Sequence, residues 1–244
     1  MHLAILMTNT DEGDFAQQHP KDGEKFTDLL KSVRADWEIT SFDVKDGVFP
    51  ETLIGFDGLV ITGSPASVRD GAPWIEELMT LIKEAYLNGL PMFGACFGHQ
   101  AIAAALGGTI DYNPKGWVFG LTEASVVKKT PWTQALPATL RQYAAHKEQV
   151  VDLPNGCEIV TSSPQCPIGG FVIGAQVYTT QNHPEMTADF IEALIANFAD
   201  DIGKEVAQGA KASLTQRADN GLYAQTIARF FEHAKSEMQG PLLR

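Results

Sequence analysis

The clearest chemical signal in the sequence is a cysteine that has one glycine two residues before it and another two residues after it. Cys96 lies between Gly94 and Gly98, at the end of the apolar segment 91–95 and before a segment with helical spacing of apolar residues. Such a strand-to-helix turn holds a nucleophile in a strained conformation, and small neighbours leave room for it. The positive end of the following helix favours thiolate over thiol. We therefore predict that Cys96 is a nucleophile, although free cysteines are more often inert and buried.

A histidine and a glutamate two residues apart could provide the base that a thiol needs. His183 and Glu185 flank Pro184, just after the apolar segment 177–181. In an extended chain these two side chains share a side, so the carboxylate can orient the imidazole and stabilise its protonated form. The alternative is that Pro184 and Glu185 simply open the next helix. We predict His183 as the base and Glu185 as its orienting carboxylate.

Two other histidines are weaker candidates. His99 lies on the helix that follows the cysteine and has no acidic residue nearby. His146 could line a pocket, although a histidine in such a setting is more often on a surface loop.

Backbone N–H groups near the cysteine could stabilise an oxyanion during acyl transfer. The N–H of Phe97 is one natural donor, and we assign the second to Ser64, with Gly63 shaping the turn after the apolar segment 57–61. The alternative for this turn is an ordinary Gly-Ser-Pro loop. Gln100 follows the cysteine by one helical turn on the same face, where its amide could bind a polar substrate.

The surrounding pattern predicts an α/β fold with a mostly parallel sheet flanked by helices. In the first half, strand-like segments alternate with helical ones. The strand-like segments are 3–7, 37–44, 57–61 and 91–95, and the helical ones include 22–34 and 73–88. In the second half, short strands between turns are expected to be antiparallel additions to the sheet. These segments are 118–127, 158–162, 171–175 and 177–181.

The remainder of the chain predicts helices and no second domain. The tail over about 187–236 has helical spacing, and Leu222, Ile227, Phe230, Phe231 and Ala234 suggest a helix docked on the body. No linker is recognisable. We therefore predict one domain over 1–244, with a helical C-terminal extension from about 200 to 244.

Composition excludes several classes of protein. The net charge of −12 argues against nucleic acid or an anionic membrane as the main partner. No run of about 18 apolar residues and no signal-peptide pattern occurs, so we predict a cytoplasmic protein that does not enter the membrane. Cys157 and Cys166 lack any metal-binding or disulfide spacing and are expected to be structural, and no metal site is predicted.

Together these motifs resemble the class I glutamine amidotransferase family. Residues 94–100 (GACFGHQ) look like its nucleophile motif, residues 181–185 (QNHPE) like its His-x-Glu motif, and residues 62–65 (TGSP) like its oxyanion loop. Residues 162–167 (SSPQCP) resemble a loop of stand-alone, GMP-synthase-like members. The resemblance covers about residues 1–200.

The resemblance implies a flavodoxin-like fold and a Cys-His-Glu triad that works without a cofactor. The thiolate of Cys96 would attack the side-chain amide of glutamine. His183 would protonate the leaving ammonia and then activate water against the γ-glutamyl thioester. Gln100 would contact the glutamine substrate, and Gly116 and Trp117 would hold it by backbone contacts.

Three functions stay open at this point. The sequence has neither a Gly-x4-Gly-Lys-Ser/Thr loop nor the Ser-Gly-Gly-x-Asp-Ser loop of the synthetase half of GMP synthase, so a glutaminase would need a separate synthetase subunit to use its ammonia. The second possibility is a stand-alone hydrolase of γ-glutamyl peptides or amines with the same triad. The third is a regulatory protein that kept the fold without activity.

Overall fold

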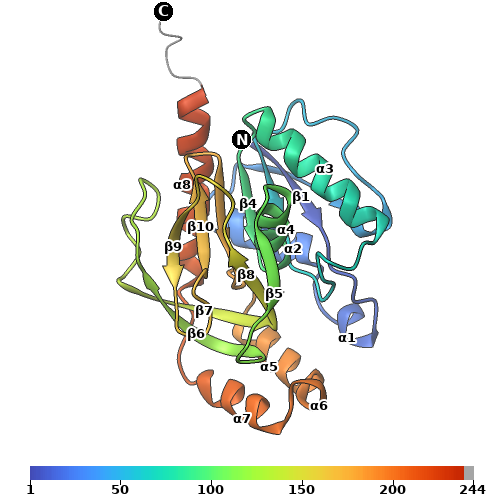
Figure 1. The fold of residues 1–244 in the computed structure, drawn as a ribbon, viewed down its shortest axis with the longest axis vertical. Helices are drawn as coiled ribbons and strands as arrows, with labels where there is room; N and C mark the ends of the chain where they lie inside the picture. Colours follow the sequence, from blue (N-terminus) through green and yellow to red (C-terminus); the bar gives the residue numbers. More distant parts are fainter. Residues whose placement is uncertain (239–244) are drawn as a thin grey trace, which may run out of the picture.

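One twisted sheet forms the centre of the molecule (Figure 1). The computed structural model describes residues 1–238 and leaves out 239–244, the last six residues of the predicted extension. Within the described residues, nine strands form this sheet in the order β2-β1-β3-β4-β11-β10-β9-β6-β7. Their bounds are Glu38–Asp43, His2–Met7, Gly58–Ile61, Met92–Ala95, Val177–Thr180, Gly170–Ile173, Glu158–Ser162, Val118–Val126 and Thr139–His146.

Five neighbouring strands, from β2 to β11, run parallel, which confirms the predicted α/β fold. The prediction that 177–181 is an antiparallel addition is wrong, because β11 pairs with β4 in parallel register, from Val177 opposite Met92 to Thr180 opposite Ala95. A short turn reverses the chain between β10 and β11, so the antiparallel half of the sheet begins at β10, the neighbour of β11. All four residues of β11 are buried, as expected for a central parallel strand.

The other half of the sheet is antiparallel, as predicted for the segments that form β10, β9 and β6. Three strands were not predicted: β7, and the separate pair β5 (Thr109–Tyr112) and β8 (Glu148–Asp152). β7 and β8 mix polar and apolar residues without the alternation that marks a half-buried strand, and β5 alternates over only four residues, which is too short to stand out. β7 nevertheless pairs with β6 along its whole length.

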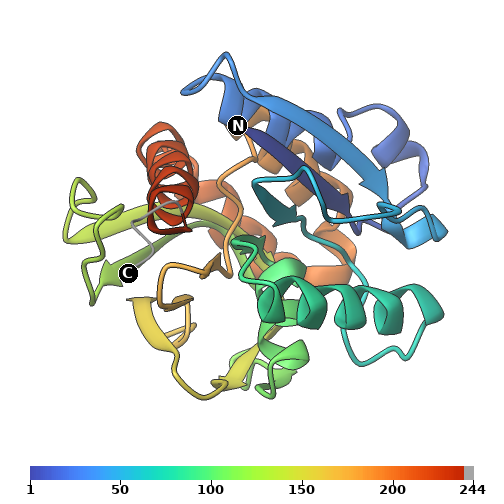
Figure 2. The same ribbon diagram turned by 90° about the horizontal axis from the view of Figure 1, so that it is seen from above.

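Helices cover both faces of the parallel half (Figure 2). On one face, α3 (Pro73–Leu87) and α4 (Phe97–Ala105) pack against apolar side chains of β1, β3 and β4. On the other face, α2 (Asp22–Lys31) and α8 (Asn220–Met238) bury a second apolar cluster. The short helices α1 (Asp14–Gln17) and η1 (Val44–Asp46) follow β1 and β2.

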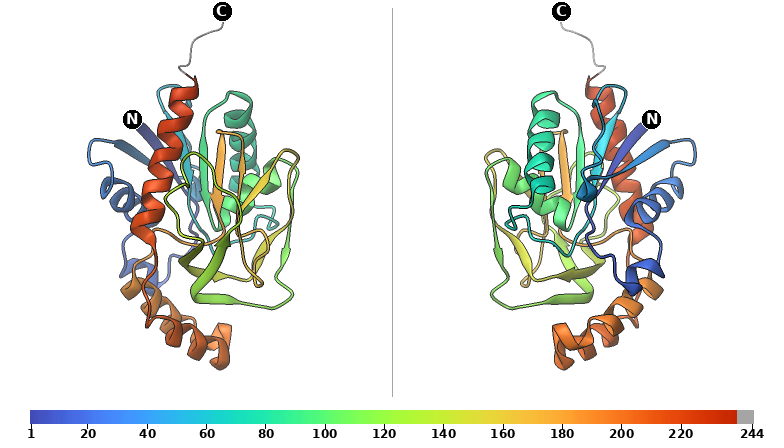
Figure 3. Two further views of the ribbon diagram at one scale, coloured as in Figure 1. Left: turned by 90° about the vertical axis from the view of Figure 1, so that its left-hand side faces the viewer. Right: turned by 90° about the vertical axis from the view of Figure 1, so that its right-hand side faces the viewer.

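The C-terminal part of the chain is helical, as predicted, and returns to the sheet (Figure 3). Helices α5 (Ala188–Asn197), α6 (Ala199–Ile202) and α7 (Lys204–Ser213) share an apolar cluster with β6 and β7. Helix α8 buries Ile227, Phe230, Phe231 and Ala234, as expected of a docked helix. Leu222 was predicted on the same face but is 45% exposed, because it lies in the first turn, on the side away from the sheet.

Candidate active site

Cys96 occupies a strained position at the end of β4. Its φ of 50° and ψ of −106° make it the one non-glycine residue with positive φ in residues 1–238. Strain of this kind persists only where the surroundings enforce it, and it gathers at functional sites. The N–H of Cys96 donates to the Thr180 carbonyl at 2.9 Å, so the end of β11 holds the turn.

The two glycines around the cysteine are required by close backbone contacts. A β-carbon on Gly94 would lie 2.6 Å from the backbone of Gly98. A β-carbon on Gly98 would overlap the carbonyl oxygen of Ile61. Helix α4 therefore starts directly against the ends of β3 and β4, which fixes the cysteine at the carboxyl edge of the parallel strands, where ligands bind in open α/β sheets.

His183 and Glu185 form a buried hydrogen-bonded pair just after β11. The imidazole Nδ1 lies 2.7 Å from the Glu185 Oε1, and the two side chains are 6% and 1% exposed. The His183 N–H donates to the Tyr143 carbonyl at 2.8 Å, which ties this segment to β7. Helix α5 begins only at Ala188, so Glu185 does not lie in its first turn. Pro184 and Glu185 form a turn instead, and this turn brings the two side chains together.

The charges around His183 favour its protonated form. Burial lowers the pKa of the imidazole, but the neighbouring charges of Glu185 and Cys96 raise this pKa well above its ordinary value. Among the described residues, Nε2 of His183 has no hydrogen-bond partner. The ring therefore presents a proton that is available to a group bound beside it.

Gly63 lies beside both His183 and Cys96. A β-carbon built on it would approach the His183 Cε1 to 2.8 Å and the Cys96 β-carbon to 3.6 Å. These distances bring the cysteine, the histidine and the loop after β3 to one point, although they come from separate parts of the chain.

Two backbone N–H groups remain available at this point. Phe97 is the first residue of α4, so its N–H has no partner within the helix. Within residues 1–238, neither its N–H nor that of Ser64 makes a hydrogen bond. Both could therefore face a developing negative charge on a bound substrate.

Thr8 supports this loop and was not predicted from the sequence. Its buried hydroxyl lies 3.0 Å from the carbonyl oxygens of both Thr62 and Gly63. Its position directly after β1, at the carboxyl end of a parallel strand, is the signal that could have drawn attention to it.

A cavity of about 810 Å³ opens beside the cysteine. Cys96, His183 and Glu185 line it together with Gly63 and Ser64. Its remaining walls come from β6 and β7, from the segment around α1 and α2, and from α5. These walls include Trp117, Phe119, Lys147, Phe15, His19, Lys25 and Phe190.

The predicted substrate-binding residues have different positions. Trp117 lines the cavity, whereas Gly116 and Gln100 are not among its lining residues. The side-chain amide of Gln100 donates instead to the Glu148 carbonyl at 3.0 Å and to the Gln181 Oε1 at 3.1 Å. The structure therefore turns this amide toward the protein interior.

His99, His146 and Cys166 are buried, Cys157 is half-buried, and all four are poorly suited to chemistry. Burial lowers the pKa of His99 to about 3 and that of His146 to about 4, so both stay neutral. His146 lies on β7, not on a surface loop. Burial raises the pKa of Cys157 to about 11 and that of Cys166 to about 12, which keeps both as unreactive thiols.

The described chain offers neither a metal site nor a membrane-spanning helix. Across residues 1–238, no group of three or more His, Cys, Asp or Glu side chains could hold a metal ion. None of the helices in this part of the chain is long and apolar enough to cross a membrane.

Comparisons with known proteins point to one family. The profile of the family "Glutamine amidotransferase class-I" matches residues 24–202. Gamma-glutamyl peptidase 4 of Arabidopsis thaliana is 28% identical, with 93% of this chain and 94% of that protein covered. A glutamine-hydrolyzing GMP synthase subunit from Halobacterium salinarum is 30% identical, with 71% and 91% covered. A glutamine amidotransferase from Thermotoga maritima has the same fold, with a TM-score of 0.75, 21% identity and 95% and 98% covered. The chain belongs to the class-I glutamine amidotransferase family.

Proposed function

We propose that the protein is a cysteine-dependent amidohydrolase that cleaves the γ-amide of a γ-glutamyl compound, with glutamine as the simplest substrate. The observation that carries this proposal is the convergence of Cys96, His183 and Gly63 at the cavity wall, with Glu185 hydrogen-bonded to the histidine. A strained nucleophile, an oriented base and two unpaired N–H groups are the parts that acyl transfer requires.

In the first half-reaction, the Cys96 thiolate attacks the amide carbon and a carbon–sulfur bond forms. The carbonyl electron pair moves to the oxygen, where the N–H groups of Phe97 and Ser64 stabilise the negative charge. When the intermediate collapses, the carbon–nitrogen bond breaks and His183 gives its Nε2 proton to the leaving nitrogen. Ammonia leaves from glutamine, and the enzyme carries a γ-glutamyl thioester.

In the second half-reaction, water takes the place of the leaving amine. His183 accepts a proton from this water as its oxygen attacks the thioester carbon. The carbon–sulfur bond breaks, glutamate leaves, and the thiolate is restored beside the protonated histidine. Glu185 holds the ring in the required tautomer throughout and stabilises its positive charge.

A second candidate differs only in the leaving group, which would be a peptide or a larger amine. The cavity volume favours it, because about 810 Å³ lies within the roughly 300–1,000 Å³ typical of sites for drug-sized ligands and exceeds what glutamine alone requires. The near full-length similarity to a plant protein named gamma-glutamyl peptidase 4 supports the same choice.

A glutaminase role would add a partner. The similarity to the GMP synthase subunit from Halobacterium salinarum supports a separate synthetase as the consumer of ammonia. Full-length GMP synthases are much longer than this chain, which spans 27% of the one from Clostridium novyi.

Substrate preference tests these alternatives. The purified protein is incubated with L-glutamine and with a panel of γ-glutamyl peptides and amines, and glutamate release is measured with Cys96→Ala as the blank. Preference for glutamine supports the glutaminase, and preference for a larger γ-glutamyl compound supports the stand-alone hydrolase. No turnover of any compound, together with a Cys96 that reacts no faster with iodoacetamide than Cys157, would refute the catalytic proposal and favour a regulatory role.

A further inference from the structure

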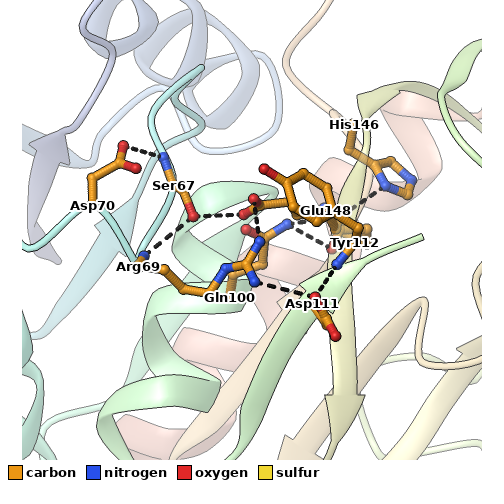
Figure 4. Close-up of polar contacts among 9 residues, drawn as sticks. Ser67, Arg69, Asp70, Gln100, Asp111, Tyr112, His146 and Glu148 are labelled. Carbon is orange, nitrogen blue, oxygen red and sulfur yellow. Dashed lines mark hydrogen bonds and ion pairs between the residues drawn. The ribbon is translucent and has the colours of Figure 1, made fainter. Parts of the chain in front are cut away.

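A buried carboxylate outside the cavity links the parts of the proposed site (Figure 4). Glu148, the first residue of β8, is 7% exposed and does not line the cavity. Its Oε2 accepts a hydrogen bond from the Ser67 hydroxyl at 2.7 Å, and its Oε1 accepts one from the Arg69 guanidinium at 2.7 Å. Both donors belong to the loop that follows Ser64.

The backbone of the same residue holds two other segments. Its carbonyl accepts the Gln100 amide at 3.0 Å, which links it to α4 one turn after the nucleophile. The Nδ1 of His146 lies 3.1 Å from the same oxygen, which links it to β7, the strand that also holds His183. Figure 4 shows these contacts converging on Glu148 from three sides.

The loop after β3 is thus held at two places. Near its start, the Thr8 hydroxyl contacts the carbonyls of Thr62 and Gly63. Near its end, Glu148 holds Ser67 and Arg69. Ser64, whose N–H is unpaired within residues 1–238, lies between the two attachments. The direction of this N–H therefore depends on both.

We propose that Glu148 is a positioning residue for the oxyanion donor: its carboxylate holds the loop so that the Ser64 N–H points to the substrate oxygen. This inference rests on the proposed function, because it assigns Glu148 a role in the same acyl transfer. Glu148 touches neither the substrate nor the reacting atoms. Its effect passes through Ser67 and Arg69 to the loop.

The proposal predicts which properties change when the carboxylate is replaced. An oxyanion donor acts mainly in the transition state, so its displacement lowers kcat and leaves KM little changed. Alkylation of a thiolate by iodoacetamide forms a carbon–sulfur bond and expels iodide without any oxyanion. The alkylation rate of Cys96 should therefore stay the same, which separates a displaced donor from a collapsed site.

The test uses Glu148→Gln, which keeps the shape of the side chain but removes the charge that binds the Arg69 guanidinium and replaces one acceptor oxygen by an amide N–H group. Loss of a complete oxyanion donor costs about 10²–10³-fold in kcat, so displacement should cost roughly 10–100-fold. Its matched control is Asp111→Asn. Asp111 pairs with the same guanidinium at 3.1 Å, but this ion pair is exposed to solvent and therefore weak, and Asp111 makes no contact with Ser67, so the control should keep wild-type turnover.

A milder variant covers the case in which Glu148→Gln does not fold. Ser67→Ala removes the hydrogen bond to Glu148 and the one that the Ser67 hydroxyl accepts from the Arg69 backbone N–H at 3.2 Å, but it leaves the pair between Arg69 and Glu148 in place. It should lower kcat several-fold with unchanged alkylation. Wild-type kcat in a folded Glu148→Gln variant would overturn the proposal, as would equal losses in kcat and in alkylation rate. Absence of turnover by the wild-type protein would instead refute the proposed function itself.

Discussion

Replacing Gly63 by alanine should disable the site while the fold persists. Gly63 does not have positive φ, so alanine can adopt its backbone conformation, and any effect must come from the added methyl group. That methyl would lie 2.8 Å from the His183 Cε1, whereas carbon atoms in contact prefer about 3.5–4.0 Å. The ring must therefore move by roughly 0.7 Å or more away from the new methyl group, out of its present position beside Cys96.

The histidine cannot make this movement freely. Its Nδ1 is held at 2.7 Å by Glu185, and both side chains are buried. A misplacement of about 1 Å can cost 10²-fold in rate, so we expect a loss of about 10–100-fold in kcat/KM. Overpacking of this kind costs about 1–3 kcal/mol in the free energy of unfolding, which leaves the protein folded.

The assay measures kcat/KM with the best γ-glutamyl substrate, and thermal unfolding confirms the fold. The control is Gly209→Ala, because Gly209 is exposed in α7 and its added methyl would have open space. This variant should keep full activity and gain up to about 1 kcal/mol from helix propensity. A Gly63→Ala variant that retains more than half of the wild-type kcat/KM would refute the geometric reasoning.

Three other predictions concern the proposed triad and the two remaining cysteines. Cys96→Ala or His183→Ala should lower turnover by several orders of magnitude in a folded protein, as measured by glutamate release, and half of the wild-type rate in either variant would sink the assignment. The pKa of His183 is raised in the folded protein, so its ion pair with Glu185 stabilises the fold at pH values below about 6.5, the pKa of an imidazole in the unfolded chain. This stabilisation is lost as the pH rises through the pKa that His183 has in the folded protein. The difference in Tm between wild type and Glu185→Gln should therefore narrow as pH is raised, and a difference that widens would contradict the pair. At neutral pH, iodoacetamide should alkylate Cys96 much faster than Cys157 or Cys166, because burial raises the pKa of the latter two; peptide mapping that finds equal rates would count against a reactive Cys96.

The local features of the site could be predicted because they depend on residues close together in the sequence. The glycines beside Cys96 indicated a tight turn, and the turn has the strained φ of 50°. The spacing of His183 and Glu185 indicated that their side chains meet, and they do at 2.7 Å, although a turn at Pro184 and Glu185 brings them together and not the extended chain that was expected.

The long-range features could not be predicted because they depend on which strands become neighbours. The cysteine and the histidine meet because β11 lies in parallel beside β4, but the sequence pattern suggested an antiparallel addition there. Gln100 shows the same limit. Helical spacing placed it on the face of the nucleophile, but acceptors on Glu148 and Gln181, far away in sequence, bind its amide.

The supporting residues were missed for a similar reason. Thr8, Ser67 and Glu148 have no motif of their own, and each acts through a contact with a distant segment. Single polar residues of these types are common on protein surfaces. Only their burial and their partners distinguish them.

The most direct test of the account is to identify the residue that carries the acyl group during turnover. The protein is mixed with a γ-glutamyl substrate, quenched in acid, and mapped by peptide mass spectrometry beside Cys96→Ala. We expect one γ-glutamyl group on Cys96 of the wild type, and neither the group nor glutamate release in the variant. A γ-glutamyl group on another residue, or glutamate release by Cys96→Ala at the wild-type rate, would contradict the account.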